Sequence, residues 1–266
     1  MNIDIDRYVE IERGSYSIGV CKDIIEKMSK KIGCADIKRE FLYNSYPLHD
    51  VEIEGCQIAK RLVTLSEFER FVDESGYLTD AERDGWGWTW EDRWIKRRDV
   101  YWKAPFHGKA DDIYYKNKNI IPVLQVSWND AIAYCGWLSM KANCVRLLYE
   151  REWEVFAQVS SFAGMGDIDS NNNRKLYNCK VDYLKDLISM INSNPEDHYP
   201  GMLWEWNYDW FDIYPNGISN KEYGTVYKVL RGGSLQSYAV QRTREYRFRR
   251  CPSARSPFYG FRIVIA

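Results

Sequence analysis

The amino-acid sequence predicts one α+β domain, residues 1–266, with long irregular loops. Hydrophobic residues make up 45% of the chain and charged residues 28%, which is typical of soluble globular proteins. Aromatic residues reach 15%, with 11 Trp and 20 Tyr, and such a content suits irregular loops packed on wide side chains. The chain shows no internal repeat and no Pro/Ser-rich linker, which favours one domain over two.

The N-terminal part predicts short elements: a strand and turn at 7–19, a helical insertion at 20–45 and a strand at Val51–Ala59. Thr64 and Glu67 have the spacing of a capping box, which predicts a helix from about Leu65 to Glu74 that ends at Gly76. Residues 80–120 are rich in Trp and charge but show little periodicity, so we expect long loops there. Further along, the patterns predict helices at Trp128–Lys141, Glu150–Gln158 and Tyr183–Ile191, and strands at Val226–Arg231 and Phe261–Ile265.

Charge and cysteine usage narrow the class of protein. The formal net charge of −1 argues against nucleic acid or an anionic membrane as a partner. No run approaches the roughly 20 apolar residues that a membrane helix needs, and the acidic N-terminus does not resemble a secretory signal. The seven Cys are scattered without a C-x-x-C spacing, so we expect reduced thiols in a cytoplasmic protein.

Six motifs follow one another in an order that resembles a known family. They are Arg61–Tyr77, Pro122–Trp137 (PVLQVSWNDAIAYCGW), Arg146–Glu154 (RLLYEREWE), Leu203–Trp210, Val229–Ser234 (VLRGGS) and Gly260–Arg262 (GFR). Together they resemble the sulfatase-modifying-factor, or formylglycine-generating-enzyme, domain. The resemblance implies a C-type-lectin-like fold with little regular secondary structure. Members include copper oxidases that convert a peptide cysteine to formylglycine, iron enzymes, and non-catalytic ligand-binding proteins.

The charged residues of these motifs predict internal ion pairs. Glutamates that lie among Trp residues need partners if they are buried, and Arg forms bidentate pairs with carboxylates. We therefore expect an Arg–Glu–Trp lattice that fixes the fold, in which Glu152, Glu154 and Glu205 pair with Arg146, Arg231 and Arg262.

The metal chemistry of the family is not supported by the residues at the expected positions. The resemblance places the two copper-binding cysteines at Ser237 and Arg242, and neither side chain can form a copper(I) thiolate bond. Copper is therefore not expected. A three-His iron site is also not expected from three scattered His residues, although a His107/His198 cluster in space stays open. Calcium is a possible cofactor, with Glu205 and Asn178 as candidate ligands, and its loss is as compatible with the sequence as its retention.

The C-terminal segment carries a run of Arg interleaved with aromatic residues: Arg242, Arg244, Arg247, Arg249, Arg250 and Arg255. In the resembled family this stretch lines the substrate groove. Arg and aromatic side chains together suit an anionic ligand, but no motif indicates sequence-specific nucleic-acid binding. The interpretation that local acids pair with these Arg residues stays open, because the chain is nearly neutral.

Two functions follow as hypotheses. The first is a divergent enzyme that oxidises or tautomerises a small amino-acid-derived or peptide substrate. Its candidate catalytic residues are Ser234 and Tyr238, and its candidate substrate-binding residues are Ser237, Arg242, Arg247 and Trp128. The alternative is a non-catalytic module that binds a small molecule, peptide or protein in the same groove. A variable protein diversified by a retroelement is a weaker third possibility, because Arg dominates the segment where Asn, Tyr and Ser would be expected.

Overall fold

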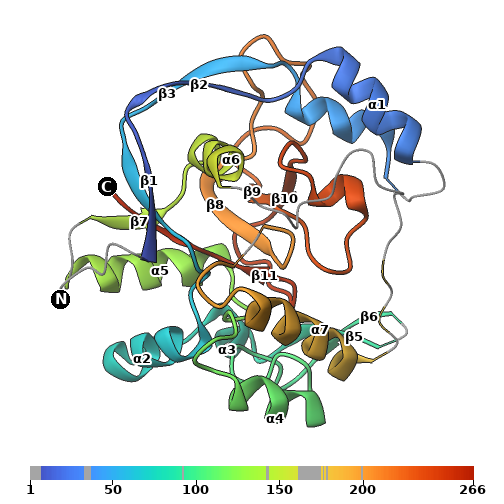
Figure 1. The fold of residues 1–266 in the computed structure, drawn as a ribbon. Helices are drawn as coiled ribbons and strands as arrows, with labels where there is room; N and C mark the ends of the chain where they lie inside the picture. The colour runs from blue at the N-terminus through green and yellow to red at the C-terminus, as the bar shows by residue number, and fades with distance from the viewer. Residues whose placement is uncertain are drawn as a thin grey trace.

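The computed structural model describes residues 7–32, 37–91, 93–141, 144–160, 175, 177, 179–198 and 200–266, and it has the predicted mixed α+β fold (Figure 1). One four-stranded sheet has the strand order β1-β4-β12-β7, and a second has the order β10-β9-β8-β11. Two-stranded ribbons are formed by β2 with β3 and by β5 with β6. The strands are β1 (Tyr8–Ile11), β2 (Gly14–Ile18), β3 (His49–Ile53), β4 (Cys56–Ala59), β5 (Gly87–Trp90), β6 (Trp94–Arg97), β7 (Val145–Leu147), β8 (Trp204–Trp210), β9 (Lys228–Arg231), β10 (Phe248–Arg250), β11 (Tyr259–Gly260) and β12 (Ile263–Ile265).

The helices are α1 (Lys22–Ile32), α2 (Leu65–Ser75), α3 (Asp80–Asp84), α4 (Lys109–Lys116), α5 (Trp128–Ser139), α6 (Glu150–Val159) and α7 (Lys180–Ser193), with 3-10 helices η2 (Arg39–Ser45) and η3 (Ala239–Arg242). The predicted helical insertion at 20–45 thus contains α1 and η2, which contact each other. The described part of the chain contains no helix that is long and apolar enough to span a membrane.

Both strands predicted near the N-terminus are divided in two. β1 pairs with β4, whereas β2 pairs with β3, so each long segment changes partner midway. Gly55 lies at the break between β3 and β4 with a φ of +85°, and a Cβ there would lie 3.3 Å from the backbone nitrogen of Arg13. A residue with a side chain would be strained in this conformation. The glycine therefore allows the two segments to bend together.

The capping box of α2 and its end at Gly76, which the sequence predicts, are confirmed. The side-chain oxygen of Thr64 accepts a hydrogen bond from the backbone nitrogen of Glu67, and the Glu67 carboxylate accepts one from the backbone nitrogen of Thr64 at 2.8 Å. Gly76 ends α2 in the left-handed conformation. Ser127 caps α5 in the same way as Thr64 caps α2. These caps satisfy backbone donors that the first helical turn leaves free.

The long loops expected at 80–120 are wrong in part. The segment contains α3, the β5-β6 ribbon and α4. Thr79 and Glu82 form a second capping box at the start of α3. In β5, cross-strand pairing sets Trp90 opposite Trp94 of β6, and their rings meet edge to face. Packing between large aromatic rings thus stabilises the β5-β6 ribbon, although the sequence of this segment shows little periodicity.

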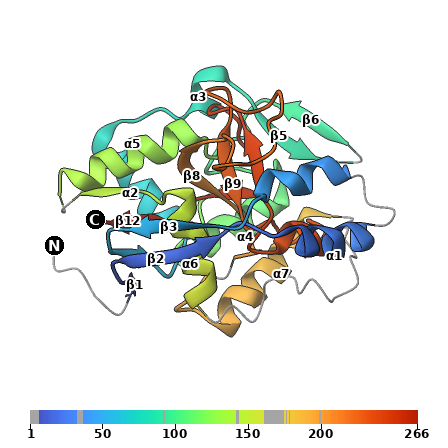
Figure 2. The ribbon, with the colours of Figure 1, turned by 90° about the horizontal axis from the view of Figure 1, so that it is seen from above.

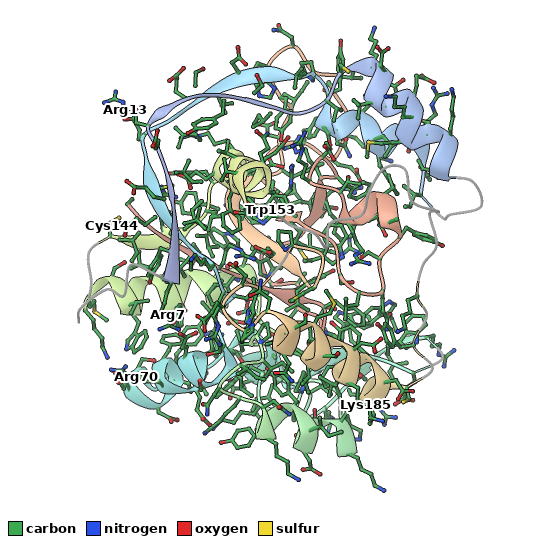
Figure 3. All side chains as sticks on the ribbon, in the orientation of Figure 1. Arg7, Arg13, Arg70, Cys144, Trp153 and Lys185 are labelled. Atoms are coloured by element: carbon green, nitrogen blue, oxygen red, sulfur yellow. The ribbon has the colours of Figure 1, made fainter. Side chains whose placement is uncertain are left out.

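The interior brings the motifs together. The β8-β9 sheet and helix α6 contact each other near the middle of the molecule (Figures 1 and 2). Trp153 of α6 lies at this centre with 0% exposure, whereas Arg13, Cys144 and Lys185 lie at the periphery (Figure 3). β12 lies between β4 and β7 and pairs with both in antiparallel register. The C-terminal motifs therefore lie in the core, where β12 joins β4 to β7.

Candidate functional site

Buried ion pairs fix the segment that follows β9. Arg231 donates to Glu150 at 2.8 Å and to Glu154 at 2.6 Å, and its side chain is fully buried. Arg247 donates to both carboxylate oxygens of Glu150 at 2.7 Å. Although burial opposes ionisation of Glu150, Arg247 and Arg231 hold its pKa below the ordinary value. This part of the predicted Arg–Glu lattice is confirmed, with Glu150 as an additional member.

The remaining pairs of the lattice are also present. Arg262 binds Glu205 through Nε at 2.5 Å and Nη2 at 2.8 Å, and the Trp153 indole donates to the same carboxylate at 3.0 Å. Arg146 binds Glu152 in a bidentate pair. The motif residues therefore serve the fold, because their charges are satisfied inside the protein.

The turn after β9 places the residues that the resemblance compares with copper ligands. Gly232 and Gly233 have φ values of 94° and 74°. The Ser237 hydroxyl accepts a hydrogen bond from the backbone nitrogen of Ser234 at 3.0 Å, and the two hydroxyl oxygens are 3.2 Å apart. Both serines are buried. The two hydroxyls thus bond to each other and to this turn.

Tyr238 and Arg242 follow this turn in the chain and are half-buried. Tyr238 caps the short helix η3, where its backbone nitrogen donates to the Gln241 side chain at 3.1 Å. Burial lowers the pKa of Arg242, and the nearby Tyr177 opposes that shift. Arg242 therefore lies toward the segment that contains Tyr177.

Two of the sequence-predicted binding residues lie elsewhere. The Arg247 side chain is 1% exposed, and its nitrogen donors bind Glu150 and the backbone oxygens of Asn44 and Asp212. Trp128 donates from its indole nitrogen to the Asn207 backbone oxygen and stacks on Trp210. Neither residue lines the cavity described next, and the guanidinium of Arg247 is enclosed by protein acceptors.

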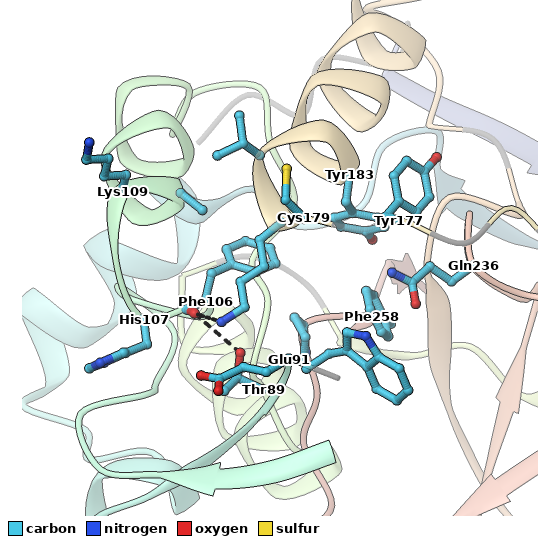
Figure 4. Close-up of a pocket in the computed structure, with 15 residues that line it drawn as sticks. Thr89, Glu91, Phe106, His107, Lys109, Tyr177, Cys179, Tyr183, Gln236 and Phe258 are labelled. Atoms are coloured by element: carbon cyan, nitrogen blue, oxygen red, sulfur yellow. Dashed lines mark hydrogen bonds between the residues drawn. The ribbon is translucent and has the colours of Figure 1, made fainter. Parts of the chain in front are cut away.

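A cavity of about 690 Å³, here called cavity 1, opens beside the turn (Figure 4). Separate parts of the chain line it: residues 89–91, residues 106, 107, 109 and 110, residues 177, 179–181 and 183, and the C-terminal residues Gln236, Pro257 and Phe258. Gln236 lies between Ser234 and Ser237, so the cavity adjoins the turn. Sequence reasoning identified the neighbours of Gln236 but missed the cavity-lining residue itself.

Cavity 1 combines aromatic walls with charged groups of both signs. Phe106, Tyr183 and Phe258 supply apolar surface, and Glu91 supplies a negative charge (Figure 4). Lys180 also lines the cavity and supplies a positive charge. Lys180 donates to the backbone oxygen of Phe106, and burial lowers its pKa, with Glu91 and Asp111 opposing the shift. A hydrogen bond from Arg97 lowers the pKa of Glu91. A carboxylate and a lysine therefore border one apolar space.

The metal sites of the family do not fit the residues present. Ser237 and Arg242 offer a hydroxyl and a guanidinium, which are unsuited to copper(I). The Glu205 carboxylate is fully buried and already binds Arg262 and Trp153, so a calcium ion would have to displace a guanidinium. Asn178, the other candidate calcium ligand, lies outside the described residues. Among the residues that are described, no group of three His, Cys, Asp or Glu side chains could hold a metal ion.

The His residues do not gather at one site. His198 is fully buried, and its Nδ1 accepts from the backbone nitrogen of Leu62 at 3.1 Å. Burial, with the charges of Arg61 and Arg262, lowers its pKa to about 3. His107, in contrast, borders cavity 1. His198 therefore acts as a neutral structural residue.

Comparisons with known proteins agree with this architecture. A family model described as "Sulfatase-modifying factor enzyme 1-like domain" matches residues 2–266. The chain is 26% identical to a formylglycine-generating enzyme of Mus musculus over 81% of this chain and 67% of the relative, and 28% identical to one of Streptomyces coelicolor over 81% and 80%. It is also 28% identical to "Inactive C-alpha-formylglycine-generating enzyme 2" of Bos taurus over 71% and 68%.

Solved structures show the same fold. PvdO from Pseudomonas aeruginosa superposes with a TM-score of 0.59 at 19% identity and covers 97% of this chain and 93% of its own. Treponema denticola variable protein 1 superposes with a TM-score of 0.55 at 17% identity, with coverage of 97% and 94%. At these identities the likeness concerns the fold alone.

Proposed function

Because the chain belongs to the sulfatase-modifying factor enzyme 1-like family yet has a hydroxyl and a guanidinium where the copper-binding thiols are expected, we propose that it binds a small amino-acid-derived or peptide ligand in cavity 1. The observation that carries this proposal is the pairing of aromatic walls with an acid and a lysine in one open space. Copper-dependent formation of formylglycine is not part of the proposal.

The chemistry of the lining favours a zwitterionic ligand with an apolar side chain. Glu91 offers an acceptor for an ammonium group, and Lys180 and Lys109 offer donors for a carboxylate. Phe106, Tyr183 and Phe258 would cover an apolar side chain, and most small-ligand sites combine such walls with a few polar groups. A free amino acid or a short peptide has both features.

The turn beside the cavity favours binding over catalysis. An active-site hydroxyl needs an adjacent base to become a nucleophile. In the described chain, neither Ser234 nor Ser237 forms a hydrogen bond with a carboxylate, a lysine or a histidine. The similarity to a relative named as inactive is compatible with this interpretation.

The proposal can be tested with dipeptides that carry free termini, such as phenylalanylglycine, and with their acetylated and amidated counterparts as uncharged controls. Calorimetry would measure affinity, and maleimide labelling would report on the exposed Cys179, which borders the cavity. We expect the charged dipeptide to bind and to protect Cys179. Lys180→Met should weaken binding by about tenfold, because a charge-assisted hydrogen bond contributes about 1.5–3 kcal/mol.

Lys185→Met is the matched control, since Lys185 lies on the same helix and is 68% exposed. Equal affinity of the Lys180 and Lys185 variants, or full labelling of Cys179 in saturating dipeptide, would argue against cavity 1. Mass spectrometry of the same incubations, made in air with and without copper, would detect turnover. A change in peptide mass would favour the divergent enzyme instead.

A further inference from the structure

A second cavity lies next to cavity 1, and its lining includes three tryptophans and two arginines. This cavity 2 has a volume of about 420 Å³ and is lined by residues from α3, the β5-β6 ribbon and the C-terminal segment. Its walls include Trp86, Trp88 and Trp94. Trp94 also contacts Trp90 and Phe258 of cavity 1, with ring centroids 5.5 Å apart in each case. The two cavities are therefore neighbours, and the aromatic side chains of Trp90, Trp94 and Phe258 lie between them.

The cationic side of cavity 2 comes from two arginines. Arg255 is 3% exposed and donates to the Asp84 carboxylate at 2.7 Å and to the Trp86 backbone oxygen at 2.8 Å. Its Nε, also buried, has no hydrogen-bond partner in the described part of the chain. Arg250 is exposed, and no described carboxylate lies within ion-pair distance of it. The lining thus carries more positive than negative charge.

The tryptophans make a flat ligand more suitable than a simple ion. Trp94 is 42% exposed, so its ring is accessible to solvent. Trp86 already contacts two of the protein's own cations, Lys96 at 3.9 Å and Arg255 at 4.0 Å from the ring centroid. A cationic ligand would meet these charges and Arg250, so the cavity disfavours a cation despite its aromatic walls.

We propose that cavity 2 binds a small planar aromatic anion, a ring that carries a carboxylate or a phosphate. The ring would stack against Trp88 and Trp94, and the oxyanion would bind the guanidinium of Arg250, with the buried Nε of Arg255 as a further donor. The site is separate from the ligand proposed for cavity 1, because different residues line it.

The test uses the full chain and phenyl phosphate as the probe, with inorganic phosphate and benzyl alcohol as controls for the anion and the ring. Cys251 is exposed and lines cavity 2, whereas Cys179 lines cavity 1, so one maleimide experiment reports on both. Phenyl phosphate should protect Cys251 from labelling and leave Cys179 reactive. It should bind about tenfold more tightly than either control, because benzyl alcohol lacks the ion pair and inorganic phosphate lacks the ring.

Two variants distinguish a loss of binding from a loss of folding. Arg250→Gln should weaken phenyl phosphate binding by about tenfold, whereas Arg244→Gln, also at an exposed Arg of this segment, should leave it unchanged. Thermal melts would verify that both variants fold. Unchanged protection of Cys251 in Arg250→Gln, or equal binding of inorganic phosphate and phenyl phosphate, would overturn the proposal. Because Cys179 reports on cavity 1 alone, failure here leaves the dipeptide result intact.

Discussion

Replacing Glu205 by Gln tests whether this buried carboxylate balances Arg262 or binds a metal. Glu205 has 0% exposure, and the Arg262 side chain is 1% exposed. The substitution keeps the size of the side chain but leaves a guanidinium without its carboxylate. Removing one partner of a buried pair typically costs about 3–5 kcal/mol, because the other charge stays desolvated.

The expected loss is measurable by heat or by urea. One kcal/mol shifts the midpoint of a chain of this size by about 2–4 °C, so Glu205→Gln should lower Tm by about 6–20 °C. Glu54→Gln is the matched control, because Glu54 pairs with Arg13 at the surface with 79% of its side chain exposed. That exposed pair should contribute less than about 1 kcal/mol.

The same melts, repeated in excess chelator and in excess calcium, separate the two roles of Glu205. We expect no calcium dependence for either protein, because both carboxylate oxygens bind Arg262. Two results would refute this reasoning: a loss below about 1 kcal/mol for Glu205→Gln, or a calcium-dependent rise in Tm that this variant abolishes.

Three further predictions concern stability. His198 has a pKa of about 3 in the fold against 6.5 in an unfolded chain, so its contribution to stability is present above pH 6.5 and is lost as the pH falls. In urea unfolding below pH 6.5, the free energy of unfolding of the wild-type chain should fall with pH more steeply than that of His198→Asn, by about 1.4 kcal/mol per pH unit. Gly233→Ala should destabilise the chain by more than Gly76→Ala, because both glycines are left-handed but only a Cβ at Gly233 would meet a backbone oxygen, at 2.7 Å; thermal melts of equal size would contradict this. Thr64→Ala should cost about 1 kcal/mol through loss of the α2 cap, and an unchanged urea midpoint would show that the cap is unimportant.

Local chemistry made much of the fold predictable. The caps of α2 and α5 follow from side chains three residues apart, which interact whatever the rest of the chain does. The lattice was predictable because a Glu among Trp residues needs a partner, and Arg is the best available one. The α3 helix and the β5 strand also had local patterns, a Thr79–Glu82 capping box and Trp at every second position from Trp86 to Trp90, that were overlooked.

The candidate site was less predictable because its parts come from distant segments. Cavity 1 needs Thr89, Phe106, Tyr177 and Tyr183 to converge on Gln236, and no spacing in the sequence encodes that meeting. The residue type of Arg247 predicts a place in the groove, but its two hydrogen bonds to Glu150 hold it in the core. Residue type predicts which charges need partners, whereas only the fold decides which of them stay accessible.

The position of β12 has a consequence for how the chain is made. Strand β12 fits between β4 and β7, so the sheet has a vacant slot until residues 263–265 have been synthesised. Until then β4 and β7 expose edges that could pair with other chains, and such unpaired edges promote aggregation. During translation, this sheet can therefore close only after β12 has been synthesised.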